Sequence, residues 1–233
     1  MIDPILSFAS YLAGTGNDQI KAVTTDPAGN IYVTGTTTSA DFPLQKPEQK
    51  AFIQGDAFVS KLDPTGRSLL FSTYVGGSNG AVGSSIVVDG NGNVLVGGVS
   101  GSSDFPHAGA VPSPGCGING TCFFILSLKA DGSALNYSGL IGGAEGFPTN
   151  GNNGLIAADA AGNAYLTGVT DDPNFKLTPG TLGPTMPTNF QESAFVLKVD
   201  STGAVGYSTI IPGNATRTPH SQTITVSPRL EFP

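Results

Sequence analysis

The sequence predicts an all-β protein made of tandem four-stranded repeats, and two observations support this prediction. The first is composition: the 233 residues include 33 glycines and 17 prolines, while only 12% are charged. Because 39% of the residues are hydrophobic and fall in short β-branched runs, the pattern is typical of many short strands rather than of a disordered chain. The second observation is an internal repeat, and it decides the fold.

Two sequence motifs each recur three times. The first is an aspartate turn with the pattern Asp-x-x-Gly-Asn followed by an apolar run, in residues 26–35, 89–98 and 159–168. The second is an apolar run followed by a turn that ends in glycine, in residues 57–66, 123–132 and 194–203. A further strand then ends at Gly77, Gly143 and Gly213, and the same strand stands alone before Gly14. The spacing predicts three complete repeats.

Each repeat predicts four strands, A to D, in two hairpins. Aspartate accepts backbone hydrogen bonds two residues further on, and Gly or Asn tolerates positive φ, so the A–B and C–D connections are expected to be tight turns. The predicted turn residues are Asp26, Asn30, Asp89, Asn93, Asp159 and Asn163 in the A–B turns, and Gly66, Gly132 and Gly203 in the C–D turns.

A long connection joins strand B to strand C in every repeat, over residues 35–56, 98–122 and 168–193. It holds a Ser-x-Asp-Phe-Pro segment at equal offsets in the first two repeats, and a degenerate copy in the third. We expect its phenylalanines, Phe42, Phe105 and Phe175, to anchor the connection against the sheet. Four antiparallel strands with two tight turns and one long loop are typical of a β-propeller blade.

The expected organisation is a single β-propeller region over residues 1–233. It comprises a lone D strand in residues 1–14, blades in 15–77, 78–143 and 144–213, and a lone A strand in 214–233. The partial blades lack strands B and C, so the chain is not expected to close a ring alone. Two interpretations remain open: the chain is part of a larger propeller, or it is an arc completed by another chain. Exposed A and D edges would be templates for strand pairing.

These motifs resemble the SBBP repeat, a bacterial β-propeller repeat. Its pattern is nearly complete in residues 26–77, with DPAGNIYVTG, SADFP, DAFVSKL and a final YVGG. The second copy departs from it at Cys122 and Ser127, and the third in the Asp-Phe-Pro segment. The resemblance implies a propeller in secreted or surface proteins of bacteria, and it implies no particular activity.

Charge and hydropathy exclude two classes of partner. The net charge is −7 and no cluster of Lys or Arg exists, whereas nucleic-acid binders need a basic patch. No apolar run approaches the roughly 18–20 residues that span a bilayer. We therefore expect neither nucleic acid nor membrane insertion.

The two cysteines, Cys116 and Cys122, lie six residues apart in a loop rich in Gly, Pro and Asn. A local disulfide is the preferred interpretation, and it implies an oxidising compartment, secreted or at the cell surface. Two unpaired thiols are the alternative. A metal site is disfavoured, because neither His107 nor His220 is near in sequence.

The sequence offers little for catalysis. The recurring aspartates occupy turns, where accepting backbone hydrogen bonds is a sufficient role. Calcium binding at Asp89, Asn91 and Asn93 is a minor alternative, since the segment lacks the closing carboxylates of an EF-hand. We expect no enzyme and no cofactor, with a glycan-active hydrolase or lyase as the alternative.

The function expected from these features is a non-catalytic extracellular scaffold, an adhesion or protein-interaction propeller. It would bind a protein or a surface glycan, and a variant of this hypothesis is self-assembly into an oligomer or filament through the unmatched terminal strands. A carbohydrate-binding or carbohydrate-processing propeller is the alternative. The glycosylation sequons at Asn119, Asn136 and Asn214 arise readily by chance in a chain this rich in Asn, Ser and Thr.

Overall fold

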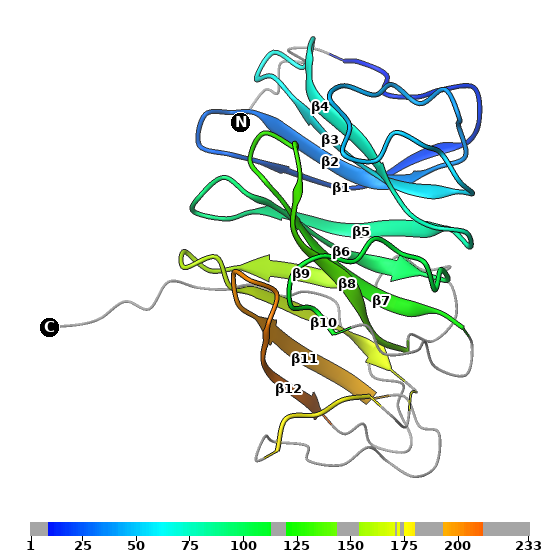
Figure 1. The fold of residues 1–233 in the computed structure, drawn as a ribbon. Helices are drawn as coiled ribbons and strands as arrows, with labels where there is room; N and C mark the ends of the chain where they lie inside the picture. The colour runs from blue at the N-terminus through cyan, green and yellow to red at the C-terminus, as the bar shows by residue number, and fades with distance from the viewer. Residues whose placement is uncertain are drawn as a thin grey trace, which may run out of the picture.

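The computed structural model describes residues 9–112, 120–143, 154–170, 172, 175–179 and 193–211. These residues form three four-stranded antiparallel sheets, in which strands that follow one another in the chain are neighbours (Figure 1). We call the sheets blades 1, 2 and 3. Within the described ranges no helix is long and apolar enough to cross a membrane.

The blades share one strand order. Blade 1 consists of β1 (Asp18–Thr25), β2 (Ile31–Thr37), β3 (Asp56–Leu62) and β4 (Leu69–Val75). Blade 2 consists of β5 (Ala81–Val88), β6 (Val94–Ser100), β7 (Cys122–Leu128) and β8 (Leu135–Gly143). Blade 3 consists of β9 (Leu155–Ala158), β10 (Ala164–Thr170), β11 (Ser193–Val199) and β12 (Val205–Ile211). The predicted all-β class and the three four-stranded repeats are confirmed.

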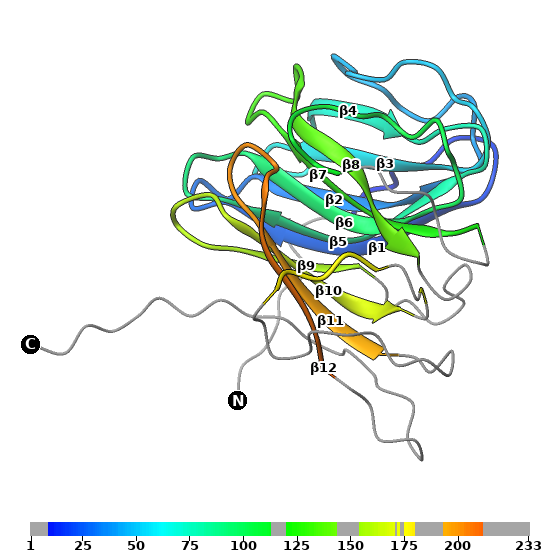
Figure 2. The same cartoon turned by 60° about the horizontal axis from the view of Figure 1, so that its bottom comes forward.

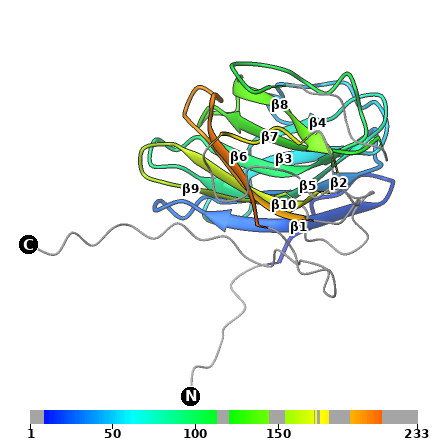
Figure 3. The same cartoon turned by 90° about the horizontal axis from the view of Figure 1, so that it is seen from below.

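The blades stack face to face, with their first strands in contact: β1 lies against β5, and β5 against β9. Figure 2 shows the strands of blade 3 running obliquely to those of blade 1, and Figure 3 shows blade 1 from β4 at the top to β1 at the bottom. Every residue of β7 is buried, because β7 belongs to the middle blade and has a neighbouring sheet on each face.

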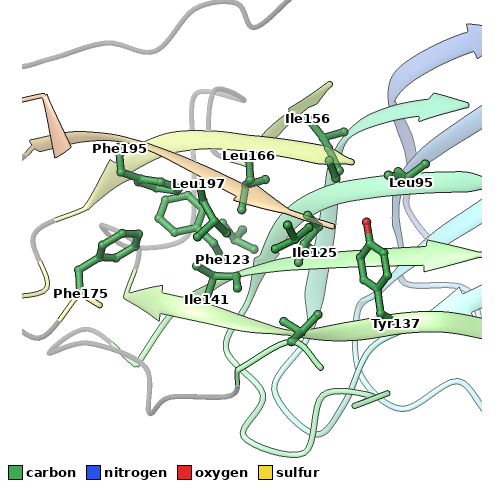
Figure 4. Packing of buried hydrophobic residues seen from close by; sticks show 14 of the residues in the cluster. Leu95, Phe123, Ile125, Tyr137, Ile141, Ile156, Leu166, Phe175, Phe195 and Leu197 are labelled. Atoms are coloured by element: carbon green, nitrogen blue, oxygen red, sulfur yellow. The ribbon is translucent and has the colours of Figure 1, made fainter. Parts of the chain in front are cut away.

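Alternate residues of a strand serve opposite interfaces. In β7, Phe124 and Leu126 belong to the apolar cluster shared with blade 1, whereas Phe123 and Ile125 belong to the cluster shared with blade 3. Figure 4 shows the second cluster, in which side chains of β7 and β8 meet those of β10 and β11. The two-residue period of a strand therefore divides each repeat into a face for the preceding blade and a face for the following one.

The B–C connection returns along the outer edge of strand D in each blade. Gln45 and Ser72 exchange two backbone hydrogen bonds, with N···O distances of 3.1 and 2.8 Å. Ala108 and Ser138 exchange two at 2.9 Å, and the Thr178 amide donates to the Ser208 carbonyl at 2.9 Å. The loop of each blade therefore covers part of the outer edge of its own strand D, which limits pairing of that edge with other chains.

The lone strand expected before Gly14 is not formed in residues 9–14, where no strand hydrogen bonding occurs. Tyr11 in this segment is 99% exposed. A D strand pairs with a C strand, and each C strand in the described part of the chain already has its own D strand, so this segment has no sheet to join. The lone A strand expected in residues 214–233 lies outside the described residues.

The packing between blades 2 and 3 predicts a large effect of Phe195→Ala. Phe195 is fully buried, and its ring centroid lies 4.8 Å from that of Phe123 and 4.7 Å from that of Phe175. We expect a loss of about 3–5 kcal/mol in the free energy of unfolding, because truncating a core phenylalanine leaves a cavity. Urea denaturation followed by circular dichroism measures it. The control is Val23→Ala at an exposed site, with a change within about 0.5 kcal/mol; similar losses for both variants would contradict the packing.

Candidate functional site

The aspartates of the A–B turns use both carboxylate oxygens within their own turns. Asp26 accepts hydrogen bonds from the Asn30 amide at 2.9 Å, from Asn30 Nδ2 at 2.7 Å and from the Tyr32 hydroxyl at 2.9 Å. Asp159 makes the equivalent set with Asn163 and Tyr165 at 2.9, 2.7 and 3.0 Å. The turn that the sequence indicates is thus held by its aspartate and asparagine together.

These bonds set the protonation state of the turn carboxylates. Burial acts to raise the pKa of Asp26 and of Asp159, but the hydrogen bonds from the turn asparagines and tyrosines outweigh it, so that each pKa lies below its usual value. Burial, and then the neighbouring Asp26, raises the pKa of Tyr32. A carboxylate held in its charged form at neutral pH is a poor general acid.

The turn proposed as a calcium site is similarly occupied. Asp89 Oδ1 accepts from the amides of Asn91 and Asn93 at 2.8 Å each, and Asp89 Oδ2 accepts from Asn93 Nδ2 at 2.9 Å. A cation at Asp89 would compete with these three bonds. No cluster of three His, Cys, Asp or Glu side chains suited to a metal occurs in the described part of the chain.

The C–D turns follow the same principle. Asp63 Oδ1 accepts from the Arg67 amide at 3.0 Å, and Asp200 Oδ1 accepts from the amides of Thr202 and Ala204 at 2.8 and 3.0 Å. The three turn glycines lie in the left-handed region: Gly66 (φ 66°), Gly132 (φ 73°) and Gly203 (φ 87°). That conformation is accessible to glycine without strain.

The phenylalanines of the B–C connections are buried on their own blades. Ring centroids lie 4.6 Å apart for Phe42 and Phe58, 4.7 Å for Phe105 and Phe124, and 4.7 Å for Phe175 and Phe195. In every pair the second ring comes from strand C, so the structure places the loop residue over the centre of its sheet.

The beginning of each B–C connection also holds the segment that enters strand A. Asp104 Oδ1 accepts from the Ser78 amide at 2.8 Å, and Ser102 Oγ accepts from the Asn79 amide at 2.9 Å. In blade 1, Asp41 and Ser39 make the same bonds to the amides of Thr15 and Gly16, at 2.9 and 2.8 Å. Residues 14–17 therefore approach blade 1 as residues 77–80 approach blade 2.

The B–C loop of blade 1 is fixed along its length yet exposes polar side chains. The Tyr74 hydroxyl donates to the Ser39 carbonyl at 2.7 Å, and the Gln49 amide donates to Thr73 Oγ1 at 2.8 Å. Between these ties, Lys46 is exposed and has a φ of 46°; it is the one non-glycine residue with positive φ among the described residues. Backbone strain of this kind persists only where surrounding contacts impose it, and it is common at binding sites.

An apolar groove of about 210 Å³ lies between blades 2 and 3. The lining includes Ile141, Phe175, Leu177 and Leu197, and Lys176 is its one charged residue. Without a carboxylate, histidine or thiol on its described walls, the groove could bind an apolar group but presents no acid–base pair there.

Sequence reasoning missed Asp56, which begins strand C of blade 1. Its side chain is fully buried: Oδ2 accepts from the Ile53 amide at 2.9 Å, and Oδ1 has no hydrogen-bond partner. Burial raises the pKa of Asp56, and the backbone hydrogen bonds do not offset it. The neighbouring Gly76 has no room for a side chain, since an added Cβ would collide with Asp56 Oδ1.

The remaining predicted residues are less informative. Cys122 is buried at the position of Asp56 in blade 2, whereas Cys116 lies outside the described residues. Of the sequons, Asn119 and Asn214 also lie outside them, and Asn136 Nδ2 donates to Ser127 Oγ at 3.1 Å. His107 is exposed and its Nε2 contacts the Val111 carbonyl at 2.9 Å.

The buried carboxyl predicts a pH-dependent difference between the wild type and Asp56→Asn. A folded-state pKa above the unfolded value adds stability below the unfolded pKa and loses it as the pH rises through the folded pKa. We therefore expect the stability of the wild type relative to Asp56→Asn to fall as the pH rises above the usual aspartate pKa of about 4.

Asp159→Asn is the matched control, with the opposite sign. The lowered pKa of Asp159 contributes stability above the unfolded pKa, and this is lost as the pH falls through the folded pKa. Urea denaturation over a pH series measures both differences. Two variants with the same sign would contradict the assigned environments.

Comparison with known families agrees with this geometry. The model of the SBBP β-propeller repeat matches residues 8–43 and 70–106. The second match begins in β4, continues through β5 and β6, and ends with the Asp-Phe-Pro segment of the B–C connection. No curated protein matches the chain. The resemblance inferred from the motifs is confirmed: residues 8–43 and 70–106 carry the SBBP β-propeller repeat.

Proposed function

We propose that this chain is a non-catalytic interaction module, in which stacked blades support long B–C loops that bind a protein partner. The observation behind the proposal is the blade 1 loop over residues 38–55. Its backbone is tied to β4 at Gln45 and Gln49, while Lys46, Lys50 and Gln54 remain exposed. A loop that keeps its shape before binding loses little conformational entropy when it binds.

The hydrogen bonding of the aspartate side chains supports a binding function rather than a catalytic one. The turn aspartates are hydrogen-bonded within their turns, and the buried Asp56 accepts its hydrogen bond from the Ile53 backbone amide. Catalysis by paired carboxylates would require two of them to converge on one substrate position. The described aspartates are instead spread over the turns and loop starts of three separate blades.

A protein partner is favoured over a glycan by the placement of aromatic side chains. Tyr32, Tyr74 and Tyr137 are buried, and so are the phenylalanines of the strands and loop anchors. Sugars stack on exposed aromatic rings, and in the described residues Tyr11 is the one aromatic among the large exposed hydrophobic side chains. Carbohydrate binding therefore remains the second candidate.

Exposed side chains of the blade 1 loop provide the test. The triple variant Lys46→Glu, Lys50→Glu and Gln54→Ala keeps the backbone ties to β4, and it should bind protein partners at least about tenfold more weakly than the wild type. The probes are a panel of secreted proteins on a biosensor and a glycan array. Arg67→Glu with Lys129→Glu, on exposed C–D turns, is the control and should bind normally. Glycan binding, or protein binding unaffected by the triple variant, would contradict the proposal.

We also propose that the module works outside the cytoplasm, in a secreted or surface protein. In blade 1 the end of the B–C loop is held by the hydrogen bond from the Ile53 amide to Asp56. Blade 2 has Cys122 at the position of Asp56, and a disulfide to Cys116 would hold its loop covalently at the same point. Such bonds persist in oxidising compartments.

The disulfide predicts a defined alkylation pattern. Denatured, unreduced protein should take up no iodoacetamide, and reduction should expose both cysteines of the chain. Cys116→Ser should expose one thiol without reduction. Mass spectrometry counts the adducts, and reduction should cost about 2 kcal/mol of stability, because the bond closes a short loop. Two adducts without reductant would contradict both the bond and the inferred compartment.

A further inference from the structure

Among the described residues, blades 1 and 3 each have a neighbouring blade on one sheet face only. Val23, Ile86 and Ile156 occupy the same position, three residues before the aspartate of the A–B turn. Ile86 and Ile156 are 4% and 3% exposed, because each packs against the preceding blade. Val23 is 64% exposed. We call the face that carries Val23 and Ile20 the front face of blade 1.

Blade 3 leaves the opposite face open. Val75 and Ile141 occupy equivalent positions near the end of strand D in blades 1 and 2, and both are buried against the following blade. Ile211 holds that position in blade 3 and is 49% exposed. Val196, equivalent to the fully buried Val59 and Ile125, is only partly buried. We call this surface the back face of blade 3.

The interfaces between neighbouring blades within the chain show which side chains each sheet face contacts. The Phe71 ring lies over Gly132 of the next blade, and the Tyr137 ring lies over Gly203, leaving no room for a side chain at either glycine. Lys61 Nζ lies 4.9 Å from the centroid of the Tyr32 ring and 3.4 Å from the carbonyl oxygen of Ala130 in blade 2. An aromatic ring over a turn glycine is thus common to both interfaces.

The two faces hold the two halves of the lysine contact between blades. On the back face of blade 3, Tyr207 takes the position of Phe71, and Lys198 lies over the Tyr165 ring at 5.5 Å as Lys61 lies over Tyr32. Blade 1 supplies a Pro64 carbonyl at the position of Ala130, and Pro64 is exposed.

We propose that two copies of this chain associate head to tail, with the back face of blade 3 in one copy packed on the front face of blade 1 in the other. Lys198 then reaches the Pro64 carbonyl of the second copy. A heterologous contact of this kind forms a closed ring or an open filament. Two copies bring together six blades, within the range of about four to eight found in closed propellers.

Ile20 of blade 1 is expected to weaken this association, as the equivalent contact between blades 1 and 2 shows. Gly83 in blade 2 approaches Thr34 so closely that an added Cβ would lie 2.1 Å from Thr34 Oγ1. Blade 1 has Ile20 at the position of Gly83, and blade 3 has Thr167 at the position of Thr34. Ile20 therefore meets Thr167 across the interface between copies and weakens it, because overpacking is unfavourable.

The mass of the full chain in solution tests the proposal. Light scattering should show a concentration-dependent rise from 23.6 kDa to twice that mass or to larger multiples. Ile20→Gly should shift the association to concentrations lower by about tenfold, since the overpacked contact is removed. Val196→Asp should keep the chain at the mass of one copy.

Ser133→Asp, at an exposed site in blade 2, is the matched control and should associate as the wild type does. Thermal unfolding of each variant shows that a loss of association is not a loss of folding. Two results would overturn the proposal. One is a single-copy mass for both the wild type and Ile20→Gly at millimolar concentration, which would assign the open faces to another partner. The other is association that Val196→Asp leaves unchanged.

Discussion

Burial of both faces of every sheet is the constraint on which the rest of this structure depends. A single four-stranded sheet of this length cannot bury its own side chains, so each repeat is stable only against a neighbour. Blade 2 meets the condition fully, as the complete burial of β7 shows. Among the described residues, blades 1 and 3 each have a neighbouring blade on one face only. The clusters are correspondingly unequal in size: Val33, Phe42, Phe58 and Tyr74 form a small buried cluster on the other face of blade 1, whereas two larger clusters join the blades.

A second constraint is that the backbone of a long loop must find hydrogen-bond partners. The B–C connections solve this by pairing with the outer edge of strand D, as Gln45 does with Ser72 and Ala108 with Ser138. The same bonds protect an edge that would otherwise pair with other chains. Side chains at the start of the loop, such as Ser102 and Asp104, then bind the amides that lead into strand A. One loop thereby fixes the outer edge of its blade and the junction with the preceding blade.

The features that could be predicted from the sequence are those in which the same side chains recur in every repeat. The turns at Asp26, Asp89 and Asp159 need particular residues, so the sequence alone placed their hairpins. The loop-to-edge pairing was not predictable, because Gln45, Ala108 and Thr178 share no side-chain property and act through backbone groups. Asp56 was missed for a related reason: Cys122 and Ser193 replace it in the other blades, so the position shows no repeated chemistry. The strand expected before Gly14 failed because a strand needs a partner, which no local pattern supplies.

The blade 1 loop combines these constraints in a way that matters for binding. Nearest-neighbour stability implies that an end blade opens more readily than the middle one. The ties of this loop, however, all lie within its own blade: Phe42 packs on Phe58, the Tyr74 hydroxyl binds the Ser39 carbonyl, and Gln49 pairs with Tyr74. None of these contacts requires a preceding blade. The loop therefore keeps its shape whether or not the front face is covered, so that blade stacking and loop recognition are separable properties of the same repeat.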